Sequence, residues 1–328
     1  MPVWLWYCIK ARSLWFFTPS NPSLTFGGFE GESKREMYEQ LPPGSYPNTI
    51  YITHLLGWGH VEQVLQKNKI EFPFAVKPDI GMMGLMFRKM ETLKDLQTYH
   101  EKIEADYLIQ DYVTYPLEVS VFYYRFPGEA KGTITGFLKK DSLSVVGDGQ
   151  STLAQLINEY PRARLRAAEL KSKHQKSLHF VLGKDEVYYL SHAFNLSRGG
   201  ELISLAHEID QDLIAVFDEL SHYTKQFFYG RYDIKCASVA ELKQGKNFTI
   251  LEFNGCGAEP HHAYGNGNKL LQAYAIFLRH WEVLYKISQK NRRFGINPWG
   301  FRKGVQHLAG ARKYFKRLKA LEMGTRLT

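Results

Sequence analysis

The spacing of apolar and polar residues along the chain predicts a mixture of short strands and amphipathic helices. Apolar residues that alternate with polar ones predict half-buried strands, and apolar residues at a spacing of three to four predict helices. Between 213 and 220, for example, five apolar residues recur at helical spacing. We predict strands near 48–53, 72–78, 84–90, 107–113, 117–125, 131–138, 186–192, 230–236 and 248–254, and helices near 33–41, 92–104, 151–174, 209–227 and 268–289.

Two short acidic motifs stand at the ends of two of these predicted strands. Arg231 and Asp233 lie two residues apart in the first, and Glu252 and Asn254 lie two residues apart in the second. Residues i and i+2 of a strand share a face, so each pair points the same way. If the strands are neighbours, three oxygen ligands and one cation form a single patch, which suits Mg²⁺ bridging phosphates. Two ordinary strands with polar solvent faces would give the same pattern.

A third segment upstream favours the phosphate interpretation. Residues 72–79 predict a short buried strand, and Gly81 and Gly84 follow in a loop before the next apolar run. Glycines in such a loop let backbone N–H groups approach phosphate oxygens closely. Lys77, at the end of the strand, can reach the same phosphates as a point charge. The Walker motif Gly-x-x-x-x-Gly-Lys-Ser/Thr does not occur in the sequence.

In their order along the chain, these motifs resemble those of the ATP-grasp superfamily, in particular D-alanine–D-alanine ligase and cyanophycin synthetase. The resemblance runs from about Lys34 to Tyr264. It implies an α+β fold of the ATP-grasp type, in which two subdomains with antiparallel sheets close over ATP. Only 33 residues precede Lys34, where such ligases usually carry a whole α/β domain that helps to hold the substrate.

The resemblance assigns nucleotide-binding roles to several residues. Lys34 and Lys77 match the two phosphate-binding lysines, with Gly81 and Gly84 in the loop over the phosphates. Backbone groups of Gln110 and Val113 would read the adenine edge, and Glu118 would hold the ribose hydroxyls. The remaining nucleotide or substrate residues are Asn195 and Arg198, in a loop that resembles the Asn-Leu-Ser-x-Gly-Gly loop of cyanophycin synthetase.

The metal and catalytic roles fall on the two acidic motifs. Asp233, Glu252 and Asn254 match the magnesium ligands of the superfamily. Arg231, which would act on the transferred phosphoryl group, and Lys77 are the predicted catalytic residues. The implied cofactors are ATP and Mg²⁺, with Mn²⁺ as an alternative metal.

The implied function is an ATP- and Mg²⁺-dependent ligase that joins a small-molecule carboxylate to an amine through an acyl phosphate. Two other functions remain open. The same residues could serve a phosphotransferase that acts on a hydroxyl group, or a non-catalytic ATP-binding module that works with a partner.

The two ends of the chain differ from its middle in composition. The net charge of +9 is carried by the residues from 291 onward, which include ten Lys or Arg and one Glu. Within this tail, residues 309–321 predict an amphipathic helix with a basic face, whose apolar stripe packs on the core by default. Residues 3–17 include three Trp but are too short and too charged to span a bilayer. Trp beside Lys and Arg suits a membrane interface, and docking on the catalytic body explains the segment equally well.

We therefore predict four parts and a cytoplasmic protein, peripheral on the inner face of the membrane. An anionic membrane surface is an expected partner, and nucleic acid is not. Three cysteines without a pattern fit a reducing compartment. The parts are an aromatic N-terminal segment and membrane-interface anchor at 1–30, ATP-grasp subdomain 1 at 31–108, subdomain 2 with the metal site at 109–290, and a basic tail with an amphipathic helix at 291–328.

Overall fold

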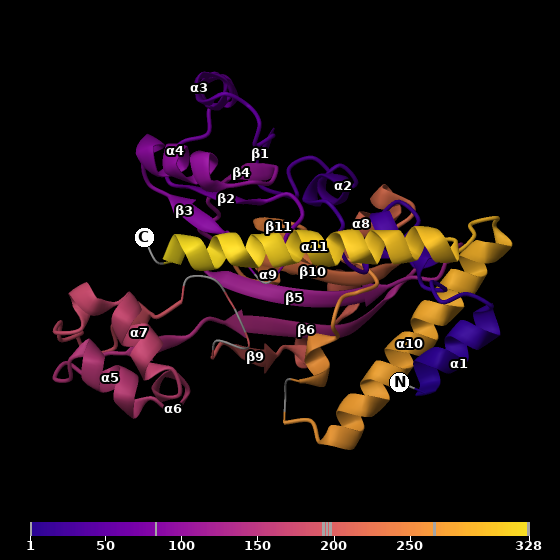
Figure 1. The fold of residues 1–328 in the computed structure, drawn as a ribbon. Helices are drawn as coiled ribbons and strands as arrows, with labels where there is room; N and C mark the ends of the chain where they lie inside the picture. Colours follow the sequence, from indigo (N-terminus) through magenta and orange to yellow (C-terminus); the bar gives the residue numbers. More distant parts are fainter. Residues whose placement is uncertain are drawn as a thin grey trace. The chain divides into compact units, whose positions relative to one another are not determined.

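A computed structural model describes residues 2–82, 84–191, 194, 196, 199–264 and 267–326. The chain divides into two compact units, a larger one of Met1–Leu138 with Leu205–Thr328 and a smaller one of Lys139–Ser204. Helices and antiparallel sheets together make up the fold, so the predicted α+β class is confirmed. Figure 1 labels the elements.

The first sheet of the larger unit has the strand order β1-β4-β2-β3, and its pairs are antiparallel. Phe74 and Ile109 are buried in its core, and a capping box of Thr92 and Asp95 starts the helix that follows β3. A strand was predicted from residue 84, but Met86 has a left-handed φ of 56° and a turn occupies the first residues. The bounds are β1 Thr49–Ile52, α3 Trp58–Asn68, β2 Phe74–Pro78, β3 Arg88–Met90, α4 Leu93–Lys102 and β4 Tyr107–Asp111.

The second sheet of the larger unit runs in the order β11-β10-β5-β6. Leu213 and Phe217 of α8 are buried in one core with Tyr232 of β10 and Val121 of β5, because the apolar stripe of α8 faces the sheet. The side chain of Asp210 caps α8 by accepting from the N–H of Leu213. The bounds are α2 Lys34–Tyr38, β5 Leu117–Tyr124, β6 Thr133–Asp141, η5 Ala206–Glu208, α8 Gln211–Thr224, β10 Tyr229–Cys236, α9 Val239–Lys243 and β11 Phe248–Asn254.

Helices from both ends of the chain pack within the larger unit. In Figure 1 the indigo α1 lies along the orange α10. Trp4 contacts Trp281 with ring centroids 5.4 Å apart, and Tyr7 stacks on Tyr285 at 4.8 Å. The bounds are α1 Pro2–Ala11, η1 Thr18–Ser20, η2 Thr25–Gly28, η6 His261–Ala263, α10 Leu270–Arg293 and α11 Phe301–Arg326.

The amphipathic helix predicted at 309–321 is part of the longer α11. Its apolar residues Phe315 and Leu318 are buried in the core of the first sheet, so the prediction that this stripe packs on the core is confirmed. Among the helices of the described ranges, none combines the length and apolar character needed to cross a bilayer.

The smaller unit contains a two-stranded sheet and short helices around its own core. One helix was predicted over 151–174, but the segment is broken into three, because Pro161 begins a new helix after Tyr160 leaves the helical conformation. Thr152 caps the first of them together with Gln155. The bounds are β7 Ser144–Val146, α5 Leu153–Glu159, α6 Pro161–Arg164, α7 Ala167–Lys173, η3 Gln175–Ser177, β8 Val187–Tyr189 and β9 Glu201–Ser204.

Candidate active site

The two acidic motifs lie side by side on the antiparallel strands β10 and β11. Asp233 pairs with Glu252, and Arg231 pairs with Asn254, so the predicted neighbourhood of the strands is confirmed. The guanidinium of Arg231 grips the carboxylate of Asp233 at two points, with Nε–Oδ1 at 3.0 Å and Nη2–Oδ2 at 3.1 Å. The amide nitrogen of Asn254 lies 3.4 Å from Oδ2 of Asp233. The four side chains therefore form one polar patch.

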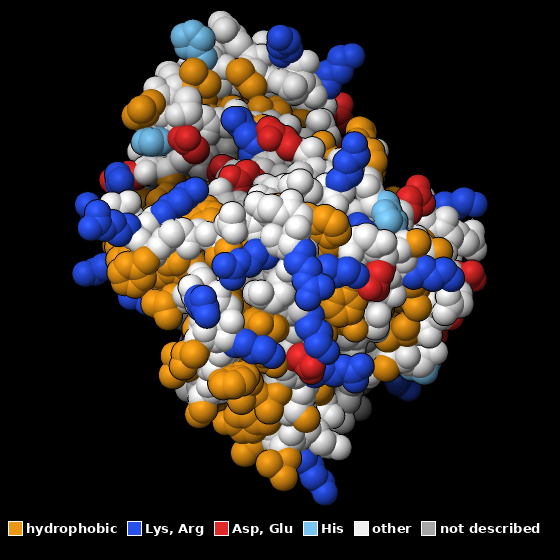
Figure 2. Space-filling view, turned by 90° about the vertical axis from the view of Figure 1, so that its right-hand side faces the viewer, with side chains coloured by type: hydrophobic (Ala, Val, Ile, Leu, Met, Phe, Trp, Pro, Cys, Tyr) orange, Lys and Arg blue, Asp and Glu red, His pale blue; other side chains and the backbone are white. Residues whose placement is uncertain are grey.

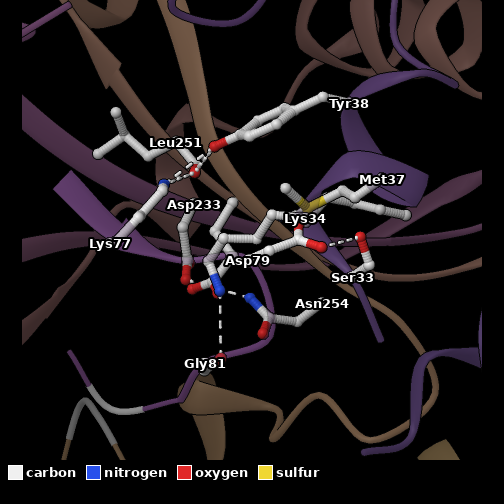
Figure 3. A network of polar contacts seen from close by, with 12 residues as sticks. Ser33, Lys34, Met37, Tyr38, Lys77, Asp79, Gly81, Asp233, Leu251 and Asn254 are labelled. Atoms are coloured by element: carbon white, nitrogen blue, oxygen red, sulfur yellow. Dashed lines mark hydrogen bonds and ion pairs between the residues drawn. The ribbon is translucent and has the colours of Figure 1, made fainter. Parts of the chain in front are cut away.

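Lys34 reaches this patch from α2. Its ammonium nitrogen lies 3.5 Å from Oε1 of Glu252 and donates to the carbonyl of Gly81 at 3.1 Å, as Figure 3 shows for the latter contact. The N-terminus of α2 is fixed by Ser33, whose hydroxyl caps the helix and donates to Asp79 at 2.7 Å. The other oxygen of Asp79 accepts from the N–H of Arg35 at 3.0 Å. A carboxylate at a helix N-terminus is favourable, so Asp79 holds the start of α2 against the end of β2.

Lys77, at the end of β2, approaches from a third element. Its Nζ donates to the hydroxyl of Tyr38 at 3.0 Å and to the carbonyl of Leu251 at 3.1 Å (Figure 3). Burial lowers the pKa of Lys77 to about 8, although the charge of Glu252 acts in the opposite direction. With a pKa of about 8, Lys77 is mostly protonated at neutral pH and loses its charge at mildly alkaline pH.

Arg231 has two further partners in the segment after β11. Its Nη1 donates to the carbonyl of Glu259 at 3.1 Å and lies 3.1 Å from Nε2 of His261, in η6. A guanidinium has only donors, so Nε2 of His261 accepts here and the ring proton sits on Nδ1. The side chain of Arg231 is thereby fixed from both sides, by a carboxylate and by an imidazole.

Two of the three residues predicted to read the nucleoside, Val113 and Glu118, are linked to Lys235. Gln110 is in the middle of the first sheet, paired on both sides, and its side-chain amide donates to Thr49 at 2.6 Å. Val113 follows β4, and its carbonyl accepts from Nζ of Lys235 at 3.2 Å. Glu118 of β5 stands opposite Lys235 in the register of the second sheet. The structure therefore groups Val113 and Glu118 through Lys235, and their roles toward adenine and ribose stay predictions.

Gly84, Asn195 and Arg198 are the remaining residues predicted for the nucleotide site. Gly84 adopts a φ of 68°, a left-handed conformation that favours glycine, and a side chain there would meet open space. Asn195 and Arg198 lie outside the described residues.

The donor set of the patch fits Mg²⁺. Asp233 and Glu252 offer carboxylate oxygens and Asn254 an amide oxygen, all of them hard ligands. In the described ranges, no group of three His, Cys, Asp or Glu side chains could hold a metal ion. Mg²⁺ is usually bound by one or two carboxylates and by substrate phosphates rather than by a complete protein cage. The patch therefore suits a magnesium ion that arrives with a triphosphate.

Sequence reasoning missed Tyr38, Asp79, Lys235 and His261. Tyr38 is four residues after Lys34, the spacing of one helix face, and Asp79 is two residues after Lys77, so local spacing could have found both. Lys235 likewise lies two residues after Asp233 in the same strand. His261 carried no such signal, because it is 30 residues from Arg231 in the sequence and meets it only in the folded chain.

No protein-family model matches the sequence, and the comparison with curated proteins finds no relative. Solved structures that the chain resembles include a D-alanine–D-alanine ligase from Bacillus anthracis complexed with ATP, with 14% identity, 82% of this chain and 67% of that chain covered, and a TM-score of 0.41. The ATP-grasp ligase PsnB complexed with minimal precursor has 14% identity, 73% and 55% coverage, and a TM-score of 0.38.

A third is the bifunctional glutathione synthetase from Pasteurella multocida, with 15% identity, 72% of this chain covered and a TM-score of 0.39. The matched region spans about a third of that synthetase (34%) and about half of PsnB (55%). Two of these three structures are named ligases, and PsnB is named an ATP-grasp ligase. The motifs of this chain resemble those of the same superfamily.

Proposed function

We propose that this protein is an ATP- and Mg²⁺-dependent ligase that joins a carboxylate to an amine through an acyl phosphate. The observation that carries the proposal is that Lys34 and Arg231 pair with the carboxylates of Glu252 and Asp233, while Lys77 binds the carbonyl of Leu251, the residue before Glu252 in β11. Each carboxylate has a cation beside it, as Lys34 lies by Glu252 and Arg231 by Asp233. A magnesium triphosphate offers partners to both kinds of group, since phosphates attract the cations and the metal attracts the carboxylates.

In this proposal, the charge and position of each side chain give its role toward MgATP. Lys34 and Lys77 hold the phosphates from α2 and β2. Asp233, Glu252 and Asn254 would hold the magnesium ion, which neutralises negative charge on the β- and γ-phosphates. Arg231 stabilises the phosphoryl group in transfer, and His261 and Asp233 keep its guanidinium oriented.

The proposed reaction has two steps. In the first, a carboxylate oxygen of the acid attacks the γ-phosphorus, the bond to the β-phosphate oxygen breaks, and ADP leaves. In the second, the amine attacks the acyl carbon, phosphate leaves with the bonding pair, and the amine loses a proton to give an amide. Arg231 holds the phosphate group that leaves in the second step. Its guanidinium therefore also lies near the oxyanion that forms at the acyl carbon.

Hydroxylamine trapping tests this proposal against the two other functions. Purified protein is given MgATP and a panel of carboxylic acids with hydroxylamine in place of the amine. A ligase of this kind releases ADP and an acyl hydroxamate in equal amounts with one of the acids. A phosphotransferase gives a phosphate ester and no hydroxamate, and a non-catalytic module binds MgATP without releasing ADP. The Arg231→Lys variant serves as the matched control for contaminating activity.

A further inference from the structure

The first helix has one face buried against the protein and another open to solvent. Trp4 and Tyr7 pack on aromatic rings of α10, and Cys8 is buried beside them. On the opposite arc, Trp6 is 58% exposed and Ile9 is 71% exposed. The helix is therefore anchored by its inner face, and its outer face presents large apolar side chains that the rest of the described chain leaves uncovered.

This exposed face continues onto the start of α11. Leu5 and Ile9 line a hollow together with Leu14 and Phe301, which is 63% exposed. Trp15 joins the segment after α1 to the start of α11, because its indole Nε1 donates to the carbonyl of Phe301 at 3.2 Å. We call the residues Leu5, Trp6, Ile9, Leu14 and Phe301 the N-terminal apolar surface.

The charged side chains that line this hollow are basic, as are the two residues that follow Phe301. Arg12 and Arg292 line the same hollow, none of whose lining residues is acidic, and Nη1 of Arg292 donates to the carbonyl of Ala11 at 2.9 Å. Arg302 and Lys303 follow Phe301 directly, and residues 1–29 include no Asp or Glu. Figure 2 looks at the end of the molecule that carries α1 and α10, and shows many hydrophobic side chains in its lower half below a band of Lys and Arg.

We propose that the N-terminal apolar surface docks on an anionic lipid membrane and holds the enzyme there peripherally. Exposed Trp and aliphatic side chains beside Arg and Lys are what interfacial helices use at the depth of the headgroups. Each basic residue near an anionic bilayer adds attraction, and the apolar side chains add burial. None of the residues of this surface belongs to the acidic motifs of β10 and β11.

A second copy of the chain is the competing occupant, and charge disfavours it. In a two-fold dimer the same patch faces itself, so Arg12 and Arg292 of one copy would approach those of the other. Like charges brought together at a contact reduce its stability. An anionic surface instead complements Arg12 and Arg292 in the hollow, and Arg302 and Lys303 after Phe301.

Vesicle co-sedimentation tests the proposal with the full chain. Phosphatidylcholine vesicles and mixed phosphatidylcholine–phosphatidylglycerol vesicles are compared at low and high salt. We expect binding to the anionic vesicles only, and weaker binding at high salt. The variant Trp6→Gln with Ile9→Gln should lose binding about tenfold or more, because two apolar side chains no longer enter the interface. Arg302→Gln should lose about fivefold, the effect of one basic residue near the surface.

Leu55→Gln is the matched control, since Leu55 is also a strongly exposed apolar residue but lies between β1 and α3. It should bind vesicles like the parent chain. All variants are checked by circular dichroism and thermal unfolding, so that loss of binding cannot be taken for loss of fold. Equal binding to neutral and anionic vesicles would overturn the proposal. Absence of binding to the anionic vesicles would also overturn it. If the chain then dimerises and Trp6→Gln with Ile9→Gln abolishes the dimer, the surface is a contact between copies.

Discussion

The ammonium group of Lys77 lies 3.0 Å from the hydroxyl of Tyr38, and both groups donate to the same carbonyl, that of Leu251. The contact joins β2, α2 and β11 at one oxygen atom. Because Tyr38 is buried and burial raises the pKa of its phenol, the hydroxyl stays protonated and can donate to Leu251 while it accepts from Lys77. Burial also lowers the pKa of Lys77, so its ammonium group loses the proton at a lower pH than an exposed lysine would.

The lowered pKa of Lys77 predicts that affinity for MgATP falls at alkaline pH. The pKa of about 8 means that Lys77 loses its proton as the pH rises through that value, and with it the attraction for phosphate. We expect the dissociation constant for MgATP to rise by about tenfold per pH unit above the pKa. Titration calorimetry from neutral pH to about pH 9 measures it. Lys77→Arg is the control, since an arginine stays charged throughout and should give a flat profile. A parent chain with an equally flat profile would contradict the prediction.

The same pKa predicts that Lys77 destabilises the folded protein at neutral pH. The unfolded chain holds this proton up to about the ordinary value of 10.5, and the folded chain only up to about 8, so the unfolded state binds more protons between them. The destabilisation is complete below pH 8 and disappears as the pH rises toward 10.5. Lys77→Met should therefore unfold at higher denaturant than the parent at pH 7 and lose MgATP affinity.

Comparison of the two chains at alkaline pH provides the control for that stability measurement. The advantage of Lys77→Met in free energy of unfolding should shrink steadily above pH 8. An advantage that stays constant with pH would show that packing of the methionine, and not the missing charge, is its cause.

Glu252 is expected to set the magnesium requirement. Its carboxylate faces Asp233 across the strand pair and lies beside Lys34. Glu252→Gln keeps the size of the side chain but removes a charged oxygen ligand, so the Mg²⁺ concentration for half-maximal ADP release should rise by about tenfold or more. Glu219→Gln, an exposed change on α8, should leave the magnesium requirement unaltered. An unchanged requirement in Glu252→Gln would exclude Glu252 as a ligand.

The patch on β10 and β11 could be predicted because strands obey a simple rule. Residues two apart share a face, so Arg231 with Asp233 and Glu252 with Asn254 could be paired from the sequence, and only the neighbourhood of the two strands was needed in addition. Lys34 and Lys77 were placed by resemblance, and the structure brings both to this patch.

The parts that could not be predicted depend on contacts between distant segments. Nothing local shows that His261 meets Arg231 or which face of the first helix packs on α10. The aromatic segment could be read as docked or as membrane-facing, and its inner face is indeed docked on α10 while its outer face is open. The break at Pro161, by contrast, was visible in the sequence, because proline rarely continues a helix.

Arg231 should be more important for turnover than for binding. Its guanidinium makes two parallel contacts with Asp233 and is aimed by His261, which a lysine cannot reproduce. Arg231→Lys should lower kcat by about 10²–10³-fold, the usual effect of losing one donor to a developing charge. The dissociation constant for MgATP should change much less, since Lys34 and Lys77 remain. Loss of MgATP binding equal to the loss of kcat would assign Arg231 to ground-state binding instead.

His261 should act on the reaction through the orientation of Arg231. Its Nε2 accepts from Nη1 of Arg231, and a hydrogen bond to a charged group is worth about 1.5–3 kcal/mol. His261→Leu removes the acceptor, so kcat should fall by about tenfold or more, with little change in MgATP affinity. His261→Gln can place a carbonyl oxygen near the same point and should recover much of the rate. In the Arg231→Lys background, His261→Leu should cost little more, because the group that it positions is gone. Full additivity of the two losses would show that His261 contributes independently of Arg231.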